Sequence, residues 1–171
     1  MHIKKYARFI KNIFCKMKRI LVTGCAGFIG YHLCLKILEN RNYKLYGIDN
    51  LNSYYDINLK KKRIEELKKN KGFNFNKIDI SNKKKIKDYL NKYKFDYFIH
   101  LAAQAGVRYS FTNPDEYLNS NIIGFYNILE NIKNYKLKHF IFASTSSVYG
   151  NSNITPFKET DDTNRPVSFY A

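Results

Sequence analysis

The chain has 171 residues, of which 44% are hydrophobic, so its length and composition suit one globular domain with a buried core. Its 30 Lys and Arg outnumber its 14 Asp and Glu, which gives a net charge of +16. No apolar run approaches the roughly 18–20 residues that span a bilayer, so no transmembrane segment is expected. The lysines are spread along predicted helix faces, so we interpret the charge as compositional and expect no nucleic-acid partner. A protein that binds RNA in a salt-dependent manner is the alternative of a different class.

The first 16 residues form a basic extension in front of the predicted domain, which we place at residues 17–171. Apolar residues recur at helical spacing from Ile3 to Met17 with cationic residues between them, a pattern also found in helices that lie on a membrane surface. We interpret the segment as a non-essential extension, and it lacks the apolar core of a signal peptide. The three cysteines, Cys15, Cys25 and Cys34, match no zinc spacing and no disulfide framework, so we expect no metal site and a reducing, cytoplasmic location.

Strands and helices alternate along the rest of the chain. Strands are predicted over 18–23, 44–48, 73–78, 96–100 and 138–143, and helices over 28–40, 57–70, 82–93 and 114–134, with Ser81 as the cap of the third helix. Such alternation produces βαβ units with right-handed crossovers, so we predict an α/β fold with a doubly wound parallel sheet of the Rossmann type. No repeat or linker divides the chain, so we expect a single domain.

A glycine-rich turn follows the first predicted strand. Gly24, Gly27 and Gly30 form G-x-x-G-x-x-G between that strand and the next helix. Glycine permits the tight turn and lets the backbone approach a pyrophosphate, while the helix N-terminus supplies free N–H groups and the positive end of its dipole. Asp49 ends the second strand, where a carboxylate accepts hydrogen bonds from ribose hydroxyls and repels a 2′-phosphate. Together these residues predict a dinucleotide site that takes NAD rather than NADP.

Further candidate residues follow the later strands. Asp79 and Ile80 come after the third strand, where they are placed to meet adenine, although Asp79 would equally suit a helix cap. The fourth strand ends at His100, which we interpret as a buried core histidine. Arg108 follows as either a contact for an anionic substrate or a member of a surface ion pair. Hydroxyl groups cluster in Ser144–Ser147 after the fifth strand, where they can hold a substrate oxygen.

These motifs together resemble the extended short-chain dehydrogenase/reductase family of NAD-dependent epimerases and dehydratases, and within it the UDP-glucuronate 4-epimerase branch. The matching stretches are ILVTGCAGFIGYHL, GIDNLNSYYDINLKKKRI, HLAAQAGVRYS, NPDEYLNSNIIGFYNILE, FASTSSVYG and PFKETD…RPVSFYA. They cover nearly everything from Met17 to Ala171. As an ordered set, these stretches are far more specific than a glycine motif alone.

The resemblance implies a role for each motif residue. The pyrophosphate would be wrapped by Gly24, Gly27, Phe28, Ile29 and Gly30, the adenosine ribose held by Asp49 and Asn50, adenine flanked by Asp79 and Ile80, and the rest of the cofactor path lined by Leu101, Ala102, Ala103, Asn121, Ser144 and Tyr170. Thr145 and Tyr170 match the family's catalytic Ser/Thr and tyrosine, and a UDP-sugar substrate would contact Arg108 and Thr145. In the 4-epimerases the tyrosine takes the proton of the sugar C4 hydroxyl while NAD takes and returns the hydride. Ser146 and Ser147 stand where the family's dehydratases have an Asp-Glu pair, which argues against dehydration.

The chain departs from the family pattern at its C-terminus. A free phenol has a pKa of about 10, and the family lowers it with a lysine in a Tyr-x-x-x-Lys motif, a position that lies beyond Ala171. The resemblance implies that the C-terminal part and substrate lobe are missing, together with one helix of a homodimer interface whose other helix is 114–134. We therefore expect the NAD-binding N-terminal part of a nucleotide-sugar 4-epimerase of the UDP-glucuronate/UDP-galacturonate type, inactive alone. The alternatives are a non-catalytic NAD-binding fragment or relic, and another nucleotide-sugar epimerase or dehydratase.

Overall fold

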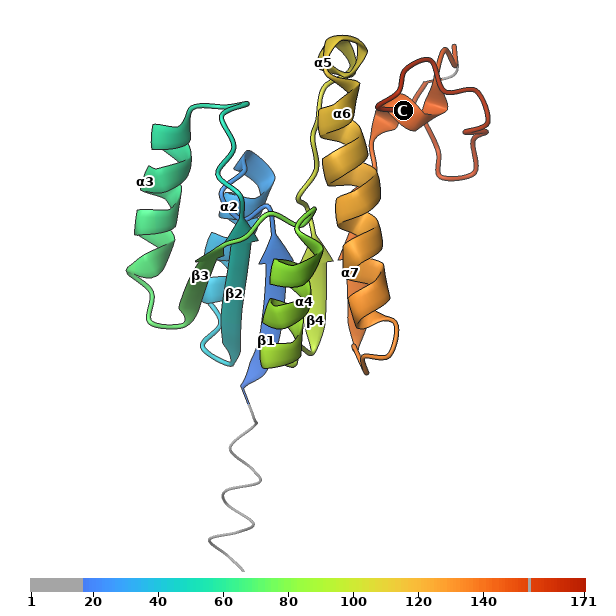
Figure 1. The fold of residues 1–171 in the computed structure, drawn as a ribbon. Helices are drawn as coiled ribbons and strands as arrows, with labels where there is room; N and C mark the ends of the chain where they lie inside the picture. The colour runs from blue at the N-terminus through green and yellow to red at the C-terminus, as the bar shows by residue number, and fades with distance from the viewer. Residues whose placement is uncertain (1–16, 154) are drawn as a thin grey trace, which may run out of the picture.

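A computed structural model describes residues 17–153 and 155–171, and a five-stranded parallel sheet forms its centre (Figure 1). The strands are β1 (Lys18–Thr23), β2 (Tyr43–Asp49), β3 (Phe73–Lys77), β4 (Tyr97–His100) and β5 (His139–Phe142), and they lie in the order β3-β2-β1-β4-β5. Each neighbouring pair is parallel. The chain winds outward from β1 to one side and then to the other, which confirms the predicted doubly wound α/β fold. In such a sheet, ligands bind where the two halves diverge, at the carboxyl ends of the strands.

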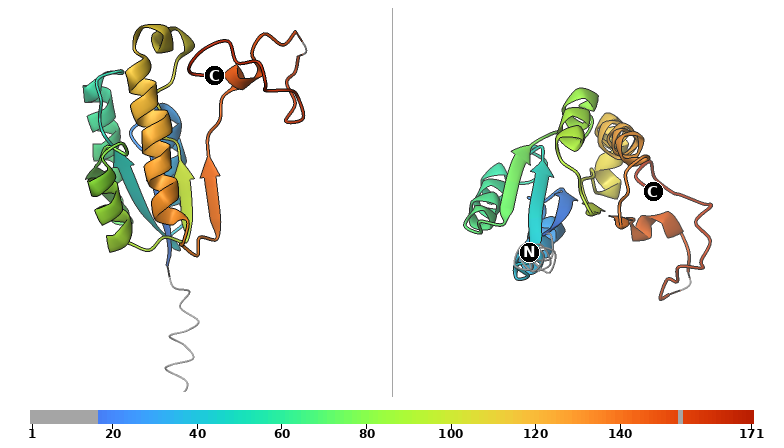
Figure 2. Two further views of the ribbon diagram at one scale, coloured as in Figure 1. Left: turned by 45° about the vertical axis from the view of Figure 1, so that its right-hand side comes forward. Right: turned by 90° about the horizontal axis from the view of Figure 1, so that it is seen from below.

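Helices cover both faces of this sheet, as the view from below in Figure 2 shows. One face carries α2 (Phe28–Leu38) and α3 (Ile57–Lys68), and the other carries α4 (Lys83–Lys92) and a helical column made of α6 (Pro114–Tyr117), the π-helix η1 (Leu118–Gly124) and α7 (Phe125–Ile132). Side chains of a strand alternate between the faces. Ile20 and Val22 of β1 therefore pack beneath α2 and α3, whereas Leu21 packs beneath α4 and α7.

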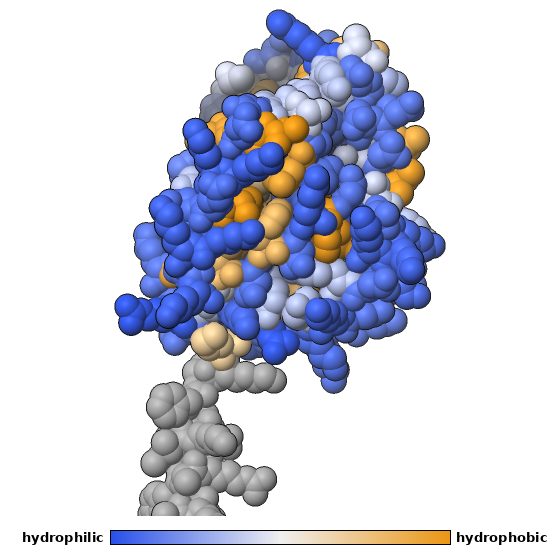
Figure 3. Space-filling view, turned by 60° about the vertical axis from the view of Figure 1, so that its left-hand side comes forward, coloured by the Kyte–Doolittle hydropathy of each residue, from blue (hydrophilic) through white to orange (hydrophobic). Residues whose placement is uncertain are grey.

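The outer surface of the molecule is mostly hydrophilic on the side drawn in Figure 3, where apolar side chains form separate small patches. No helix within residues 17–153 and 155–171 is long and apolar enough to cross a membrane. The same residues contain no group of three His, Cys, Asp or Glu that could hold a metal ion. The basic extension over 1–16, including Cys15, lies outside the described residues, so its interpretation stays a prediction.

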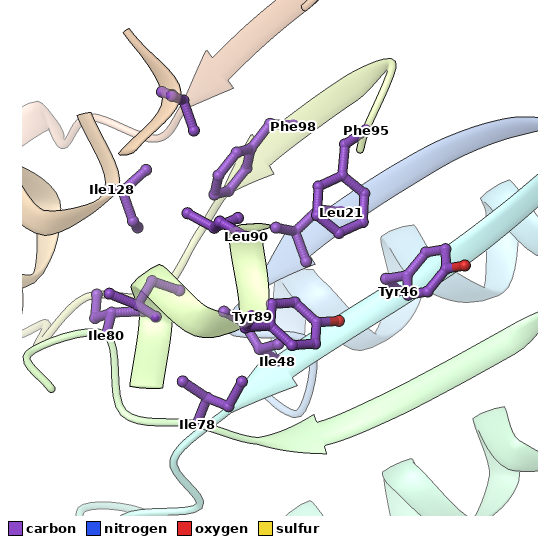
Figure 4. Packing of buried hydrophobic residues seen from close by; sticks show 12 residues of the cluster. Leu21, Tyr46, Ile48, Ile78, Ile80, Tyr89, Leu90, Phe95, Phe98 and Ile128 are labelled. Carbon is purple, nitrogen blue, oxygen red and sulfur yellow. The ribbon is translucent and has the colours of Figure 1, made fainter. Parts of the chain in front are cut away.

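The larger core cluster lies between the sheet and helices α4 and α7 (Figure 4). Leu21, Ile48 and Phe98 of the strands meet Leu90 and Ile128 of the helices, and none of these five side chains is exposed. Each such burial stabilises the fold by roughly 1.5–3 kcal/mol. The cluster therefore fixes the central strands, and with them the polar residues at their carboxyl ends.

The predicted elements agree with the observed ones to within two residues at each end. The helix predicted over 114–134 is the α6–η1–α7 column, which contains a π-helical stretch that the periodicity did not indicate. Two short elements were not predicted at all: helix α5 (Val107–Thr112) and the 3-10 helix η2 (Ser146–Tyr149). Both are too short to show a hydrophobic period.

The predicted cap of α4 is wrong. Asn82, not Ser81, is the N-cap, and its side chain accepts a hydrogen bond from the Lys85 N–H. The Ser81 side chain is directed toward Asp79 instead, since its N–H and its hydroxyl both donate to Asp79 Oδ1, at 2.8 and 2.7 Å. The same contacts exclude Asp79 as the cap, since its carboxylate is turned toward Ser81 rather than the first turn of α4.

Candidate functional site

Two neighbouring cavities lie at the carboxyl ends of the strands. The first cavity is lined by Gly24, Gly27, Asp49, Asn50, Asn52, Tyr54, Tyr55, Lys60, Leu101, Ala102, Ala103, Gln104, Ala105 and Ser120. The second cavity is lined by Ile29, His100, Leu101, Ala102, Ala103, Ala105, Asn121, Phe125, Phe142, Ala143, Ser144, Thr145, Val148, Tyr170 and Ala171. The segment that follows β4 lines both cavities, so they adjoin each other, and we call the two together the cleft.

The glycine turn between β1 and α2 needs glycine for steric reasons. Gly24 has a φ of 71°, and a Cβ there would lie 2.8 Å from the backbone nitrogen of Ala102. A Cβ on Gly30 would lie 2.1 Å from the carbonyl oxygen of Gly24. Gly27 precedes α2, and no side chain caps the first turn of that helix. Its first N–H groups and positive dipole end are therefore available to an anion such as a pyrophosphate.

Asp49 stands at the end of β2, where it is 8% exposed. Its Oδ2 accepts a hydrogen bond from the Ala26 N–H at 3.1 Å, and its Oδ1 accepts one from the Leu51 N–H at 2.8 Å. A carboxylate has about four acceptor sites, so about two remain for hydroxyl donors in the first cavity. The carboxylate thus fixes the glycine turn and the following loop while keeping the capacity to accept two ribose hydroxyls.

Lys60 is a functional candidate that the sequence analysis missed, because it stands in a lysine run that looked like a solvated helix face. It is only 6% exposed, and its Nζ donates to the backbone oxygen and to Oδ1 of Asn52, at 2.9 and 2.6 Å. Burial lowers the pKa of Lys60, Asp49 acts in the opposite direction and Arg63 lowers it further. An ammonium group has three donors, so one remains for a group in the first cavity.

Asp79 and Ile80 line neither cavity. Asp79 orients Asn50 instead, because its Oδ2 accepts a hydrogen bond from Asn50 Nδ2 at 3.0 Å. Burial acts to raise the pKa of Asp79, but the hydrogen bonds from Asn50 and Ser81 outweigh it and hold the pKa below its usual value. Ile80 is 5% exposed and packs in the core beneath α4 and α7. Their contact with adenine therefore stays a prediction, whereas Asn50 does line the first cavity.

His100 is a buried core histidine, as predicted, and it forms part of the wall of the second cavity. Thr23 Oγ1 accepts the N–H groups of Leu101 and Ala102, each at 3.1 Å, and lies 2.7 Å from His100 Nδ1. The Thr23 hydroxyl proton is therefore the one shared with His100, which makes Nδ1 an acceptor and places the ring proton on Nε2. Burial lowers the pKa of His100 to about 4, so the ring is neutral near pH 7.

Thr145 and Tyr170 line the second cavity together, beside Ser144. The Thr145 hydroxyl accepts a hydrogen bond from the Ser147 N–H at 3.2 Å and donates to Ser147 Oγ at 3.3 Å. The ring of Tyr170 lies edge-on to Tyr117, with 5.7 Å between the ring centroids. The fold therefore brings the predicted catalytic pair to one end of the cleft, although Tyr170 follows Thr145 only after a long irregular segment.

Asn121 ties the π-helix η1 to the shared wall of the two cavities. Its Oδ1 accepts the Gln104 N–H at 2.8 Å, and its Nδ2 donates to the Gln104 carbonyl at 2.9 Å. This pairing leaves one N–H of the amide for another partner. Asn121 therefore positions the segment after β4. Its direct contact with a cofactor stays a prediction.

The remaining predicted residues lie at the margin of the cleft. Phe28 and Ile29 are 68% and 66% exposed, and only Ile29 lines a cavity. Arg108 is exposed on α5 and lines neither cavity, so its contact with substrate stays a prediction. Besides Lys60, the lining residues of the first cavity that the sequence analysis missed are Asn52, Tyr54, Tyr55, Gln104, Ala105 and Ser120. Their position after β2, after β4 or within η1 was the only available signal.

Comparisons with known proteins agree with this arrangement. A family model described as GDP-mannose 4,6 dehydratase matches residues 21–171. A UDP-glucuronate 4-epimerase of Thermodesulfobacterium geofontis is 45% identical over 151 residues, which are 88% of this chain and 46% of the relative. Protein CapI of Staphylococcus aureus is 42% identical over 153 residues, which are 90% of this chain and 45% of the relative. The chain thus spans less than half the length of these relatives.

Solved structures are similar to this chain in both fold and sequence. The UDP-glucuronic acid 4-epimerase of Bacillus cereus, solved with UDP-glucuronic acid and NAD, matches with a TM-score of 0.81 at 39% identity, over 89% of this chain and 47% of that one. The UDP-Glc/GlcNAc 4-epimerase of Campylobacter jejuni matches with a TM-score of 0.80 at 31% identity, over 90% and 44%. The glycine turn, the sheet order and the family match lead to one conclusion: the chain belongs to the GDP-mannose 4,6-dehydratase family of NAD-dependent epimerases and dehydratases, within the extended short-chain dehydrogenases/reductases.

Proposed function

We propose that this chain is the NAD-binding part of a nucleotide-sugar 4-epimerase that interconverts UDP-glucuronate and UDP-galacturonate. The observation that carries the proposal is the single cleft, which has the glycine turn and Asp49 at one end and Thr145 and Tyr170 at the other. The relatives named UDP-glucuronate 4-epimerase support the substrate class. The unit that binds NAD begins at Met17.

The first cavity suits the adenosine half of NAD. The turn around Gly24 and Gly27 and the uncapped start of α2 would hold the pyrophosphate. Asp49 would accept the ribose hydroxyls, and its negative charge would disfavour the 2′-phosphate of NADP. Lys60 adds a donor at the same wall that can reach a ribose oxygen or a neighbouring phosphate. The residues present therefore fit a dinucleotide without a 2′-phosphate.

The second cavity suits the reacting end. When bound, NAD+ would take a hydride from the sugar C4 carbon and return it. The Tyr170 phenol oxygen would receive the proton of the C4 hydroxyl and give it back, and the Thr145 hydroxyl would orient the sugar oxygen. Ser146 and Ser147 follow Thr145, so no carboxylic acid stands there to protonate a leaving hydroxyl. This arrangement favours epimerisation over dehydration.

We propose that the full-length protein forms a homodimer through the α6–η1–α7 column. Leu118, Ile122 and Tyr126 lie one turn apart and are 40%, 53% and 54% exposed, so they form an apolar stripe on the outer side of the column. Sedimentation of the full-length protein and of its Ile122→Lys variant tests the stripe. We expect the unsubstituted protein to be a dimer and the variant to be a monomer. An unchanged sedimentation coefficient in the variant would contradict the proposal.

The cofactor is tested by titrating the chain with NADH and NADPH and following the fluorescence of the reduced nicotinamide. We expect NADPH to bind at least about tenfold more weakly than NADH because the Asp49 carboxylate faces the ribose. Asp49→Asn should weaken NADH binding and reduce the difference in affinity between NADH and NADPH. Asp88 is an exposed acid of α4, so Asp88→Asn should change neither the NADH affinity nor that difference. Absence of NADH binding at millimolar concentration would contradict the proposal.

The reaction is tested separately, with UDP-glucuronate and NAD. We expect no turnover by the 171-residue chain, because it lacks the lysine of the Tyr-x-x-x-Lys motif. A protein that also carries the C-terminal half found in the relatives should convert UDP-glucuronate to UDP-galacturonate with no net formation of NADH. Formation of a dehydrated sugar instead would refute the epimerase assignment.

A further inference from the structure

The loop between β2 and α3 carries two neighbouring tyrosines to which the proposed function gives no role. Tyr54 is half-buried and Tyr55 is 61% exposed, and both line the first cavity. The loop is fixed at both roots. Lys60 holds Asn52 by two hydrogen bonds, and Asp56 caps α3 by accepting the Asn58 N–H. Between these two anchors lies the tip of the loop, residues 53–55.

The tip reaches across the first cavity to helix α5. The ring centroid of Tyr54 lies 4.8 Å from that of Tyr109 on α5. The Tyr54 hydroxyl lies 2.6 Å from the point where a Cβ on Gly106 would stand, and Gly106 has a φ of 105°. Glycine at that position thus allows the tyrosine to lie directly on the backbone that leads into α5. Because β2 and β4 flank β1 in the sheet, this contact spans the glycine turn that follows β1.

The α5 side of the contact is firmly anchored. Tyr117, which is 1% exposed, donates its hydroxyl to the carbonyl oxygen of Ala105 at 2.9 Å and also contacts the carbonyl oxygen of Gly106. Its ring lies 6.3 Å from the ring of Tyr109. The α5 side is therefore held by buried contacts, whereas the loop tip is held by hydrogen bonds at its two ends. The ring of Tyr54 connects the tip to α5.

We propose that Tyr54 and Tyr109 form a strap across the first cavity that slows the release of bound dinucleotide. The inference rests on the proposed function, because the dinucleotide is NAD lying on the glycine turn beneath the strap. NAD enters and leaves when the tip swings away from α5, and the ring contact between Tyr54 and Tyr109 breaks each time. From the strength of an aromatic pair, loss of the contact should speed release about three- to tenfold.

The test is the rate at which NADH leaves the full 171-residue chain, measured by stopped-flow displacement with excess NAD+. Tyr54→Ala and Tyr109→Ala should each raise this rate about three- to tenfold, whereas Tyr54→Phe, which keeps the ring, should stay within about twofold of the wild type. The double alanine variant should be no faster than either single variant, since both remove one contact. Phe111→Ala is the matched control, because Phe111 is an aromatic residue of the same helix that is 64% exposed.

The possible outcomes separate the strap from the function on which it rests. If the wild type binds NADH but the two single alanine variants release it at the wild-type rate, or if their effects add in the double variant, the strap is wrong and NAD binding stands. A wild type that binds no NADH overturns both. If Tyr109→Ala fails to fold by circular dichroism, the comparison of Tyr54→Ala with Tyr54→Phe decides, because residue 54 lies on a loop outside the core.

Discussion

The two ends of the cleft differ in how deeply their wall residues are buried. At the first cavity, Asp49 and Lys60 are 8% and 6% exposed and are held by hydrogen bonds to the backbone. At the second cavity, the wall rests on β5, where Ile141 and Phe142 are 48% and 55% exposed. β5 is an edge strand, and no α-helix follows it within the described residues. The comparison indicates that the cofactor end rests on buried, hydrogen-bonded side chains, whereas the reacting end rests on the least buried strand of the sheet.

The largest expected effect contrasts two phenylalanines on adjacent strands. Phe98 of β4 is fully buried and Phe142 of β5 is 55% exposed. Phe98→Ala should lower the free energy of unfolding by about 3–5 kcal/mol, because it opens a cavity beneath α4 and α7. Phe142→Ala should lower it by less than about 1 kcal/mol, since much of that ring already contacts water. Urea unfolding followed by circular dichroism measures both, and similar losses for the two variants would contradict the contrast.

The second prediction concerns the glycine turn of the first cavity. Gly30→Ala should destabilise the fold by about 3 kcal/mol and abolish NADH binding, because the new Cβ would lie 2.1 Å from the Gly24 carbonyl and neither backbone segment can yield cheaply. Gly72→Ala is the control: its Cβ would lie 3.1 Å from the side-chain oxygen of Asn70, an exposed side chain that need give way by only a few tenths of an ångström. Thermal unfolding and NADH titration of both variants make the comparison. Wild-type NADH affinity in Gly30→Ala would show that the turn tolerates a side chain.

The third prediction uses His100, which joins the buried sheet to the wall of the second cavity. Its pKa is about 6.5 in the unfolded chain and about 4 in the folded one, so the unfolded state binds the extra proton between these values. The contribution of the neutral ring is complete above pH 6.5 and is lost as the pH falls toward 4. By pH 5, His100 should account for a loss of about 2 kcal/mol in the free energy of unfolding.

Unfolding in urea at pH 7 and pH 5 measures this loss. His100→Asn keeps an acceptor for the Thr23 hydroxyl but cannot take up a proton, so it should lack that part of the acid sensitivity. His139→Asn removes an exposed histidine and should keep the wild-type sensitivity. An equal acid sensitivity in all three proteins would show that His100 does not remain neutral in the folded state.

The sequence predicted the buried framework well because its signals are local. The glycine spacing, the strand-end Asp49 and the apolar period of each long helix all depend on residues close in the chain. The sequence failed where the hydrogen bonds or contacts of individual side chains decide. Ser81 resembled a helix cap, but its side chain bonds to Asp79, two residues before it.

The burial of Lys60 was missed for a related reason, because in the sequence Lys60 does not differ from the exposed lysines beside it. Its burial depends on Asn52, and hence on the fold of a loop that precedes the helix. The contact between Tyr54 and Tyr109 likewise joins segments on opposite sides of β1. Neither feature has a spacing signal, so only the folded chain reveals the lining residues they contribute.

The smallest expected effect tests whether the Lys60 ammonium group contributes to cofactor binding in the first cavity. Lys60→Met keeps the buried stem but removes the ammonium donor, and we expect NADH to bind about tenfold more weakly. Lys61→Met removes an exposed neighbour, so it should change NADH affinity by no more than about twofold. Equilibrium titration with NADH measures both variants.

ADP-ribose tests which end of the cofactor Lys60 serves. It contains the adenosine ribose and the pyrophosphate but no nicotinamide. If the ammonium contacts the ribose or phosphate directly, Lys60→Met will weaken ADP-ribose and NADH by the same factor. A loss for NADH with no loss for ADP-ribose would show instead that Lys60 acts on the nicotinamide end. Equal losses for NADH and ADP-ribose would locate the binding free energy of Lys60 at the first cavity.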